Sequence, residues 1–270
     1  MLLLHSSMLG AFVLTDCTSK NRVKGWVADA VYRALLARLL RTRLAPGRMP
    51  EHVAIIPDGN RRWARRRGLP PAVGHARGYQ VAKKTLDLLW SLGVKNVTFY
   101  ALSRENCLYR SREELENIHR LLGRAVEELL HDRRVENGQT RVFFGGDMSL
   151  LPAWLVERVE EINRATAGNG PYTLTIAVCY SGHWEIEDAI RRSCRDGEIG
   201  NIRGSMVFGW LPEPDLLIRT GGEMRLSGFL LYHIAYTELY FTRRLWPEFD
   251  EAELYRALLS FQRRERRFGR

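Results

Sequence analysis

The 270-residue sequence predicts an α/β fold, a single domain in which helices flank a mainly parallel central sheet. Short apolar runs alternate with amphipathic stretches from about residue 51 onward, and this alternation is typical of strands connected by helices. Apolar residues make up 45% of the chain, which is enough for one sizeable core. The sequence contains no internal repeat, low-complexity tract or Ser/Gly linker that would favour several domains.

Six apolar runs have the length and the β-branched and aromatic content of buried strands. They cover residues 52–57, 97–102, 140–145, 172–179, 215–218 and 239–242. Because helical stretches fall between these runs, we expect the strands to lie mainly parallel.

The first predicted helix covers residues 26–44, where Ala, Leu and Arg have high helix propensity, and it ends before Pro46. Its arginines scatter around the helical wheel, so packing against the body of the protein is favoured over a position on a membrane. Residues 1–50 are interpreted as an N-terminal extension with a basic helix, and residues 51–270 as the main domain. No run approaches the ~20 apolar residues that a membrane-spanning helix needs.

Three further helices have local signals. One carries apolar residues at three- and four-residue spacing from Tyr79 to Leu89 and ends at Gly93. The next begins at Ser111, where Ser-Arg-Glu-Glu is a capping box, and Pro152 suits the first turn of another.

The net charge of +10 is concentrated in arginine clusters, notably in residues 61–67 and 263–270. A nucleic-acid-binding face would be broader and would carry interleaved aromatic residues. Two compact clusters therefore indicate focused anion sites and no nucleic-acid partner. The four cysteines form no CxxC pair and have no regular spacing, so we predict neither a disulfide framework nor a zinc site, and a reducing, cytoplasmic setting.

The first cluster with chemistry is Asp58-Gly59-Asn60, which follows the first strand at the edge where open α/β sheets bind ligands. A helix starting near Asn60 would direct free backbone N–H groups at an anion, and Arg61 and Arg62 add full charges. An Asp among these charges suggests Mg²⁺, which commonly bridges one carboxylate and substrate phosphates. The alternative is that Asp58 is only a helix N-cap.

The second cluster, Ser103-Arg104-Glu105-Asn106, follows the second strand at the same edge. It offers a hydroxyl, a guanidinium, a carboxylate and an amide in four consecutive residues. An ordinary polar loop would have the same composition, so this alternative stays open.

The third cluster lies around the Gly-Gly turn after the fifth strand, where Arg219, Arg225 and Ser227 surround a flexible segment that can approach an anion closely. A structural salt bridge could account for either arginine. Neither a P-loop nor a strand-following GxGxxG is present, so common nucleotide-binding folds lose support.

Taken together, four ordered blocks resemble the cis-prenyltransferases, the undecaprenyl/polyprenyl diphosphate synthase family. The blocks are HVAIIPDGNRRWARRRGLP with GHARG, YALSREN, PDLLIRTGGEMRLSGFLLYHIAYTELYFTRRLWPEF, and RERRFG near the C-terminus. The resemblance extends from about residue 50 to the end of the chain, so it covers the predicted main domain as a catalytic domain.

The resemblance implies an enzyme that condenses isopentenyl diphosphate with an allylic diphosphate, farnesyl or geranylgeranyl diphosphate, to form a Z-polyprenyl diphosphate. Asp58 matches the position that holds Mg²⁺ and helps the allylic diphosphate leave, and Glu238 matches a second metal carboxylate. Asn106 matches a residue proposed to help remove the proton. The tail from Arg267 to Gly269 resembles one that reaches a partner subunit's site, which implies a homodimer.

The remaining matched positions are expected to bind substrate. They are Gly59, Asn60, Arg61, Arg62, Trp63, His75, Ser103, Arg104, Glu105, Arg110, Arg219, Arg225, Leu226, Ser227, Arg267 and Gly269. An apolar tunnel for the growing chain is expected between the helices that start near residues 79 and 112, with the small Ala101 beneath them.

The resemblance also implies that the product is the precursor of a glycosyl carrier lipid, and its greasy chain suggests peripheral membrane contact. A non-catalytic subunit of a two-chain prenyltransferase is an alternative, and a basic nucleic-acid-binding protein is another. Retention of Asp58, Asn106 and Glu238 argues against the first. The uneven charge argues against the second.

Several positions depart from the family's pattern. Arg61 stands where many relatives have Gly, Pro71 where some have a diphosphate-binding Arg, and Cys107 where an aromatic residue is usual. The equivalence of Arg110 is open because its loop is one residue longer, and Gly228 replaces a common Asn or Asp. These departures concern the choice of allylic substrate more than the class of reaction.

Overall fold

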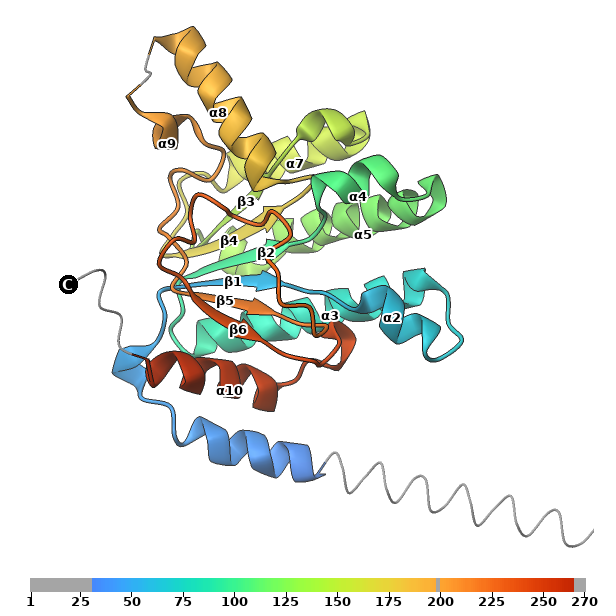
Figure 1. Cartoon of the computed structure of the whole chain (residues 1–270), viewed down its shortest axis with the longest axis vertical. Helices are drawn as coiled ribbons and strands as arrows, with labels where there is room; N and C mark the ends of the chain where they lie inside the picture. The colour runs from blue at the N-terminus through green and yellow to red at the C-terminus, as the bar shows by residue number, and fades with distance from the viewer. Residues whose placement is uncertain (1–30, 198–199, 265–270) are drawn as a thin grey trace, which may run out of the picture.

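The apolar runs form one six-stranded sheet in the order β3-β4-β2-β1-β5-β6, and every neighbouring pair of strands is parallel (Figure 1). The computed structural model describes residues 31–197 and 200–264. The strands are β1 His52–Ile56, β2 Asn96–Tyr100, β3 Thr140–Gly145, β4 Tyr172–Ala177, β5 Leu216–Arg219 and β6 Glu238–Phe241. The predicted α/β fold is confirmed, and each predicted strand is correct to within two residues at either end.

Both faces of the sheet are covered, which explains why the central strands are apolar at consecutive positions. Val53 and Ile55 of β1 belong to the larger of two hydrophobic clusters. Ala54 and Ile56, which alternate with them, belong to the smaller cluster. Successive side chains of a strand point to opposite faces, so the two clusters lie on the two sides of the sheet.

The helices follow the predicted order. They are α2 Asn60–Arg65, α3 Pro71–Ser91, α4 Arg104–Tyr109, α5 Arg112–Leu130, α6 Arg133–Glu136, α7 Ala153–Ala165, α8 Gly182–Asp196, α9 Ile202–Ser205 and α10 Glu251–Gln262. Short 3₁₀ turns cover η1 Pro46–Arg48, η2 Met148–Leu150 and η3 Trp246–Glu248.

The predicted helix boundaries are correct or nearly so. Ser111 caps α5, and its hydroxyl accepts a 3.4 Å hydrogen bond from the Glu114 backbone N–H. Gly93 follows α3 with a φ of 87°, a conformation that glycine adopts without strain. Pro152 is the N-cap of α7 and so lies one residue before its first turn.

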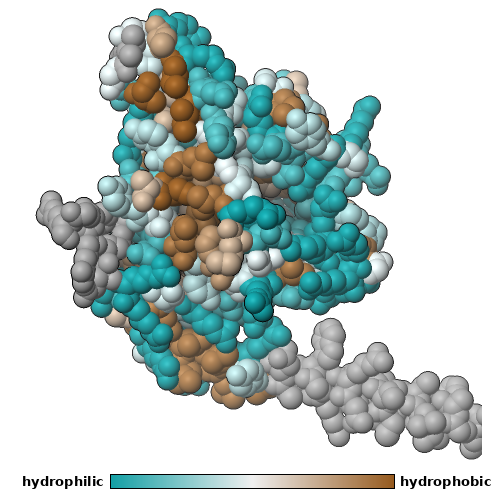
Figure 2. Space-filling view, viewed as in Figure 1, coloured by the Kyte–Doolittle hydropathy of each residue, from teal (hydrophilic) through white to brown (hydrophobic). Residues whose placement is uncertain are grey.

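The predicted N-terminal helix is described for residues 31–41 and lies beside α10 (Figure 1). Ala37 is buried, and Arg33 Nη1 lies 3.3 Å from Asp250 Oδ2, so its packing against the body is confirmed. Leu35 and Leu39 of this helix are exposed. Figure 2 shows an apolar patch over the same part of the molecule. Within the described ranges, every helix is too short or too polar to cross a bilayer.

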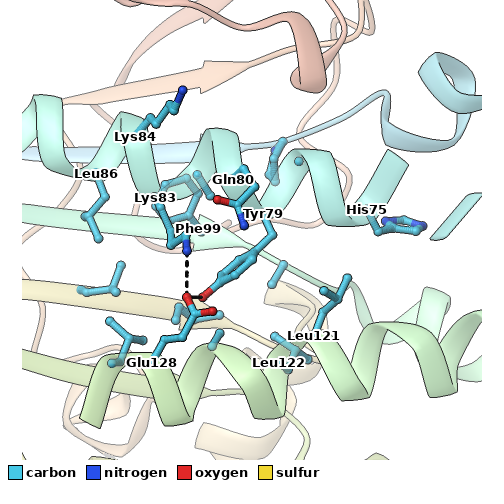
Figure 3. Close-up of a pocket in the computed structure, with 18 of the residues that line it drawn as sticks. His75, Tyr79, Gln80, Lys83, Lys84, Leu86, Phe99, Leu121, Leu122 and Glu128 are labelled. Atoms are coloured by element: carbon cyan, nitrogen blue, oxygen red, sulfur yellow. Dashed lines mark hydrogen bonds and ion pairs between the residues drawn. The ribbon is translucent and has the colours of Figure 1, made fainter. Parts of the chain in front are cut away.

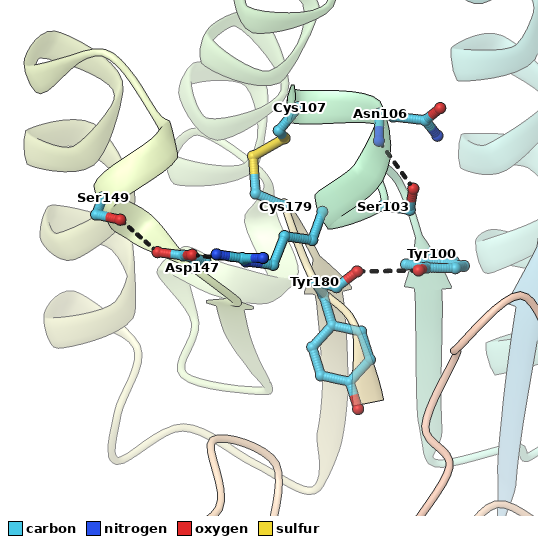
Figure 4. The surroundings of a disulfide bond; sticks show 9 residues. Tyr100, Ser103, Asn106, Cys107, Asp147, Ser149, Cys179 and Tyr180 are labelled. Carbon is cyan, nitrogen blue, oxygen red and sulfur yellow. Dashed lines mark hydrogen bonds and ion pairs between the residues drawn. A yellow bond between two sulfur atoms is a disulfide. The ribbon is translucent and has the colours of Figure 1, made fainter. Parts of the chain in front are cut away.

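The expectation that the chain has no disulfide is wrong, because Cys107 and Cys179 are bonded to each other (Figure 4). They are 72 residues apart in sequence, and their spacing therefore gives no signal. The fold brings them together because β2 and β4 are neighbours: Ser103 and Tyr180, just beyond the two strands, form a further parallel bridge. The disulfide ties α4 to the segment after β4.

Candidate active site

The sheet brings the first sequence cluster, at Asp58, next to the third, which begins at Arg219. Strands β1 and β5 are neighbours in the sheet. The chain continues from β1 to β2 in one direction across the sheet and from β5 to β6 in the opposite direction. Ligands of open α/β sheets bind at such a switch point, beyond the carboxyl ends of the strands. A cleft of about 790 Å³ lies there.

Many of the predicted site residues line this cleft. Those that do are Asp58, Gly59, Asn60, Arg61, Arg62, His75, Ser103, Glu105, Asn106, Arg110, Arg219 and Ser227. The three clusters, which are spread over residues 58–227 of the chain, therefore form one site.

Asp58 is held between two arginines. Its Oδ1 lies 3.1 Å from Arg62 Nη2, and its Oδ2 lies 3.0 Å from Arg219 Nη2. The N-cap of α2 is Gly59, without a side-chain cap, so the alternative that Asp58 caps this helix is wrong. Gly59 has a φ of 113°, and a Cβ there would lie 2.8 Å from Leu245 Cδ2, so a side chain at this position would be strained.

Several hydrogen-bonding atoms of the cleft have no partner. Arg219 is nearly buried, with 5% of its side chain exposed, and its Nε is unsatisfied. The same is true of Arg110 Nε and Asn60 Oδ1. Buried donors without a partner are costly, so guanidinium groups in this state favour an anionic ligand that accepts from them.

The loop after β5 shapes the arginine side of the cleft. Arg219 Nη1 donates to Ser227 Oγ at 2.9 Å and also to the Arg225 carbonyl oxygen. Ser227 and Gly228 both have positive φ, so the chain turns sharply around the guanidinium. This turn places the Ser227 hydroxyl next to the Arg219 cation.

The second cluster is a short helix, so its interpretation as an ordinary polar loop is wrong. Ser103 caps α4 by accepting a 3.1 Å hydrogen bond from the Asn106 backbone N–H. Figure 4 shows that the Asn106 and Cys107 side chains leave α4 on different sides. Asn106 therefore lines the cleft while Cys107 is bonded on the side of β4.

His75 lies at the boundary of the cleft in a small charged network. Its Nε2 lies 3.2 Å from Glu114 Oε1, and Arg110 Nη1 lies 2.9 Å from the same oxygen. Burial, followed by the Arg110 charge, lowers the pKa of His75 below its ordinary value. The imidazole is therefore neutral at pH 7 and offers one donor and one acceptor.

Four predicted substrate-binding residues are absent from the cleft wall. Arg104 Nε is bound to Asp147 Oδ2 at 2.9 Å (Figure 4), and the Arg67 guanidinium covers the Trp63 ring at 4.5 Å. Leu226 packs on the smaller hydrophobic cluster. Arg225 is 64% exposed and pairs with Glu223.

Glu238, the predicted second metal carboxylate, is not brought to Asp58. It is the first residue of β6 and is level with Leu216, whereas Arg219, which contacts Asp58, is level with the last residue of β6. Three residues of a strand span roughly 10 Å. Glu238 therefore lies toward the amino-terminal ends of the strands, away from the cleft. There it pairs with Arg264. Arg267 and Gly269 lie outside the described residues.

Tyr100 and His183 also line the cleft, although the motifs did not single them out. Tyr100 Oη lies 2.9 Å from the Tyr180 carbonyl oxygen and 3.2 Å from that of Ser227, which connects the second and third clusters. Tyr100 is the last residue of β2, and His183 is the second residue of α8, the helix that follows β4. Their places at the carboxyl ends of these strands, or in the helix that follows, were the available signal.

A second cavity, of about 510 Å³, adjoins the cleft. We call it the apolar groove. It lies between α3 and α5 (Figure 3). Phe99 of β2 and Leu174 and Ile176 of β4 line it from the sheet, which is its floor. The groove and the cleft have four residues in common, Pro57, Asn60, His75 and Ala101.

The family model described as "Putative undecaprenyl diphosphate synthase" matches residues 56–269. Two proteins, from Thermoplasma volcanium and Methanopyrus kandleri, are named tritrans,polycis-undecaprenyl-diphosphate synthase (geranylgeranyl-diphosphate specific). They are 43% and 42% identical over 256 and 250 residues, which cover 91% and 89% of this chain and 97% and 92% of theirs.

Two solved structures are similar. The first is lavandulyl diphosphate synthase from Lavandula x intermedia in complex with dimethylallyl diphosphate, with a TM-score of 0.75 and 33% identity. The second is a probable undecaprenyl diphosphate synthase from Campylobacter jejuni, with a TM-score of 0.68 and 27% identity. Each similarity covers 82% of this chain and 99% of the other.

Proposed function

Since the chain belongs to the undecaprenyl diphosphate synthase family of cis-prenyltransferases and is a transferase, we propose that it adds isopentenyl diphosphate units to an allylic diphosphate to form a Z-polyprenyl diphosphate. One observation carries the proposal: an arginine-lined cleft adjoins an apolar groove and has four residues in common with it. A prenyl diphosphate has the same two parts, a dianionic or trianionic head and a hydrocarbon tail.

The cleft supplies the groups that bind and activate two diphosphates. Arg62 and Arg219 present guanidinium donors beside Asp58, and the unsatisfied Nε of Arg219 is available to a phosphate oxygen. In the reaction the allylic C–O bond breaks, a C–C bond forms to isopentenyl diphosphate, and one proton is lost. Negative charge grows on the leaving diphosphate, and fixed arginine donors stabilise that charge where it develops.

The proton that is lost needs an acceptor near the new bond. Asn106 lines the cleft and is positioned by the Ser103 cap of α4. An amide is a weak base, so we assign Asn106 to orienting the reacting atoms and directing the proton toward a diphosphate oxygen. Glu105 lines the same wall as a further polar group.

We include Mg²⁺ in the proposal because the donor set at Asp58 fits it together with a diphosphate. Within the described residues no group of three or more His, Cys, Asp or Glu side chains could hold a metal alone. Mg²⁺ typically uses one or two carboxylates and completes its coordination with substrate phosphates and water. Asp58 would hold the ion, which would neutralise charge on the leaving diphosphate. Glu238 is left out because it lies at the amino-terminal end of β6, away from the cleft.

We assign the apolar groove to the growing hydrocarbon chain. Most of its lining is aliphatic or aromatic, and its walls are the inner faces of α3 and α5. Ala101 lies where the groove meets the cleft, and its small side chain leaves room for a tail. Burial of apolar surface provides the driving force for holding the chain there.

The relatives' names support geranylgeranyl diphosphate as the allylic starter and a polyprenyl diphosphate as the product. From the family resemblance we propose that this product is the precursor of a glycosyl carrier lipid. Pro71 lines the cleft where some relatives have an arginine, and Arg61, Arg65 and Arg110 line the same wall. Arg61 and Arg110 both pair with Glu114 through one nitrogen each, so their other nitrogens and the Arg65 guanidinium can replace the missing contact. We therefore propose that they bind the allylic diphosphate.

We also propose that the enzyme is a homodimer, as the resemblance of the tail from Arg267 to Gly269 implies. Light scattering on the purified protein would give the mass in solution. About twice 31.2 kDa is expected, and a monomer at micromolar concentration would contradict the proposal.

Contact with an anionic membrane surface is proposed for the outer side of helix residues 31–41. Leu35 and Leu39 are 62% and 53% exposed, and Arg38 and Arg41 are exposed beside them. Apolar side chains flanked by arginines suit a surface of anionic lipids. Vesicles with phosphatidylglycerol should sediment the wild type but not Leu35→Ser/Leu39→Ser. Equal sedimentation of both, or with neutral vesicles only, would contradict this contact.

The decisive experiment is incubation of the purified protein with labelled isopentenyl diphosphate and geranylgeranyl or farnesyl diphosphate. Mg²⁺-dependent, EDTA-sensitive long-chain products are expected, with more product from geranylgeranyl diphosphate. No product with either starter would overturn the proposal and favour a non-catalytic subunit that needs a partner chain.

A further inference from the structure

Three polar residues connect the two helices that bound the apolar groove. Tyr79 Oη of α3 donates a 2.7 Å hydrogen bond to Glu128 Oε2 of α5, and Lys83 Nζ of α3 lies 2.8 Å from the same oxygen. Lys83 Nζ also lies 4.9 Å from the centre of the Tyr79 ring. We call Tyr79, Lys83 and Glu128 the strap.

The strap lies on the solvent side of the groove. The Lys83 and Glu128 side chains are 41% and 31% exposed, whereas Phe99 of the sheet floor is 7% exposed. In Figure 3 the strap crosses the gap between α3 and α5, with His75 to one side and Leu86 to the other. His75 belongs also to the cleft, so a chain that grows away from the cleft passes the strap.

The contacts within the strap shift the pKa values of Glu128 and Tyr79. The hydrogen bond from Lys83 is the largest of the interactions that lower the pKa of Glu128 to about 2. Burial, followed by the contact with Glu128, raises the pKa of Tyr79. Glu128 is therefore ionised and Tyr79 protonated at neutral pH, and the hydrogen bond between them is charge-assisted.

A second polar group lines the groove toward the C-terminal ends of α3 and α5. Arg134 Nη1 lies 2.7 Å from Asp87 Oδ1, and Arg134 Nη2 lies 2.6 Å from Asp132 Oδ2. All three residues line the groove. Beyond the strap, therefore, a hydrocarbon chain has limited room before it meets charged side chains.

We propose that the strap is a specificity determinant that limits the length of the polyprenyl product. This inference rests on the proposed function. To lengthen further, a chain that fills the groove must push α3 and α5 apart at the strap or lie against an ionised carboxylate. Both are unfavourable, because a polar group loses its hydrogen bond or is desolvated without compensation. Growth therefore slows when the chain reaches this size.

The test compares variants that remove the strap's hydrogen bonds without emptying the groove. Tyr79→Phe retains the ring and loses only the hydroxyl, and Glu128→Gln retains the shape and loses the charge. Products from geranylgeranyl diphosphate and labelled isopentenyl diphosphate are sized by chromatography and normalised to total incorporation. The fraction longer than the main wild-type product should rise by about fivefold, the effect of one net hydrogen bond.

The matched control is Arg124→Gln. Arg124 contacts Glu128 Oε1, the other carboxylate oxygen, and is 64% exposed outside the strap. Its product lengths should equal those of the wild type. A thermal melt of each variant distinguishes loss of stability from a change in product length. A purely structural effect would lower Tm and leave the distribution of product lengths unchanged.

Each outcome decides the inference. Longer products in both strap variants but not in the control support it. Unchanged lengths in Tyr79→Phe and Glu128→Gln, with an active wild type, overturn it and leave the proposed function intact. If neither variant folds, Lys83→Met serves in their place with the same expectation. A wild type without any product would overturn the proposed function and this inference with it.

Discussion

The cleft and the apolar groove adjoin each other, yet they are built in different ways. The cleft takes most of its polar residues from the first turns and loops after β1, β2 and β5, so the main contributions are short contiguous motifs. The groove takes its residues from the inner faces of two long helices and from the sheet. The charged residues of the cleft are therefore determined by short sequence motifs. The volume of the apolar groove depends instead on the distance between α3 and α5.

The largest expected effect separates the two regions completely. Asp58→Ala should lower kcat by at least about 10³-fold, because it removes the carboxylate placed for the metal and for the leaving diphosphate. The groove contains no atom of Asp58, so binding of the apolar dye N-phenyl-1-naphthylamine should be unchanged. Turnover assays and dye titration measure the two properties.

Asp196→Ala is the control for this variant, because that carboxylate lies in α8, where it pairs with the adjacent Arg195 at 3.6 Å. Its kcat should equal that of the wild type. Near-normal turnover of Asp58→Ala would contradict the metal assignment, and lost dye binding would show that the two regions are not independent.

The disulfide belongs to the cleft side of the comparison, since Cys107 lies in α4 beside Asn106. In the loop-entropy account a cross-link over 72 residues stabilises the protein by up to about 4 kcal/mol. Cys107→Ser/Cys179→Ser should therefore lower the free energy of urea unfolding substantially. Cys194→Ser, which changes an exposed free cysteine, should leave it unchanged. Equal stability of the double variant and the wild type would show that the cross-link does not contribute.

The effect of removing an arginine on the KM for isopentenyl diphosphate should increase with the burial of its side chain. Arg219 is 5% and Arg225 64% exposed, so a phosphate contact from Arg219 is better shielded from water. Arg219→Ala should raise the KM for isopentenyl diphosphate by about 10- to 100-fold, as for a hydrogen bond to a charged group. Arg225→Ala should raise it less. Initial-rate kinetics test the order, and a larger effect at Arg225 would reverse the proposed roles.

The smallest effect is expected at the wall that both regions share. The folded-state pKa of His75 is lowered, so as pH falls below about 6.5 the unfolded chain takes up this proton first and stability is lost. His75→Gln should lose less stability than the wild type between pH 7.5 and 5.5. His131→Gln, at an exposed position, should follow the wild type. A steeper pH dependence in His75→Gln would mean that the imidazole is charged in the folded protein.

The same contrast explains how much could be predicted from the sequence. The six strands and the three polar clusters were predictable, because strand propensity and contiguous motifs are local. The pairing of Cys107 with Cys179 was not, since it depends on β2 and β4 being neighbours. The direction of Arg104 was missed for a similar reason. Its partner, Asp147, follows β3, on the far side of β4.

Glu238 shows the limit of matching motifs without the fold. The same sequence block contains Arg219. Because β5 and β6 pair in parallel, Arg219 lies at the carboxyl end of β5 and Glu238 at the amino-terminal end of β6. The strap was likewise invisible, because Tyr79 and Glu128 are 49 residues apart and lie on different helices.

The wall shared by the cleft and the groove has a consequence for how often the enzyme releases its product. Pro57, Asn60, His75 and Ala101 border both cavities. Under the proposed function, a lengthened product has its head in the cleft and its tail in the groove, and it needs only to shift by one unit to react again. Dissociation would instead return the tail to water, at a cost of ~0.8 kcal/mol for each CH₂. The architecture therefore favours processive synthesis, in which one chain is extended repeatedly before it leaves.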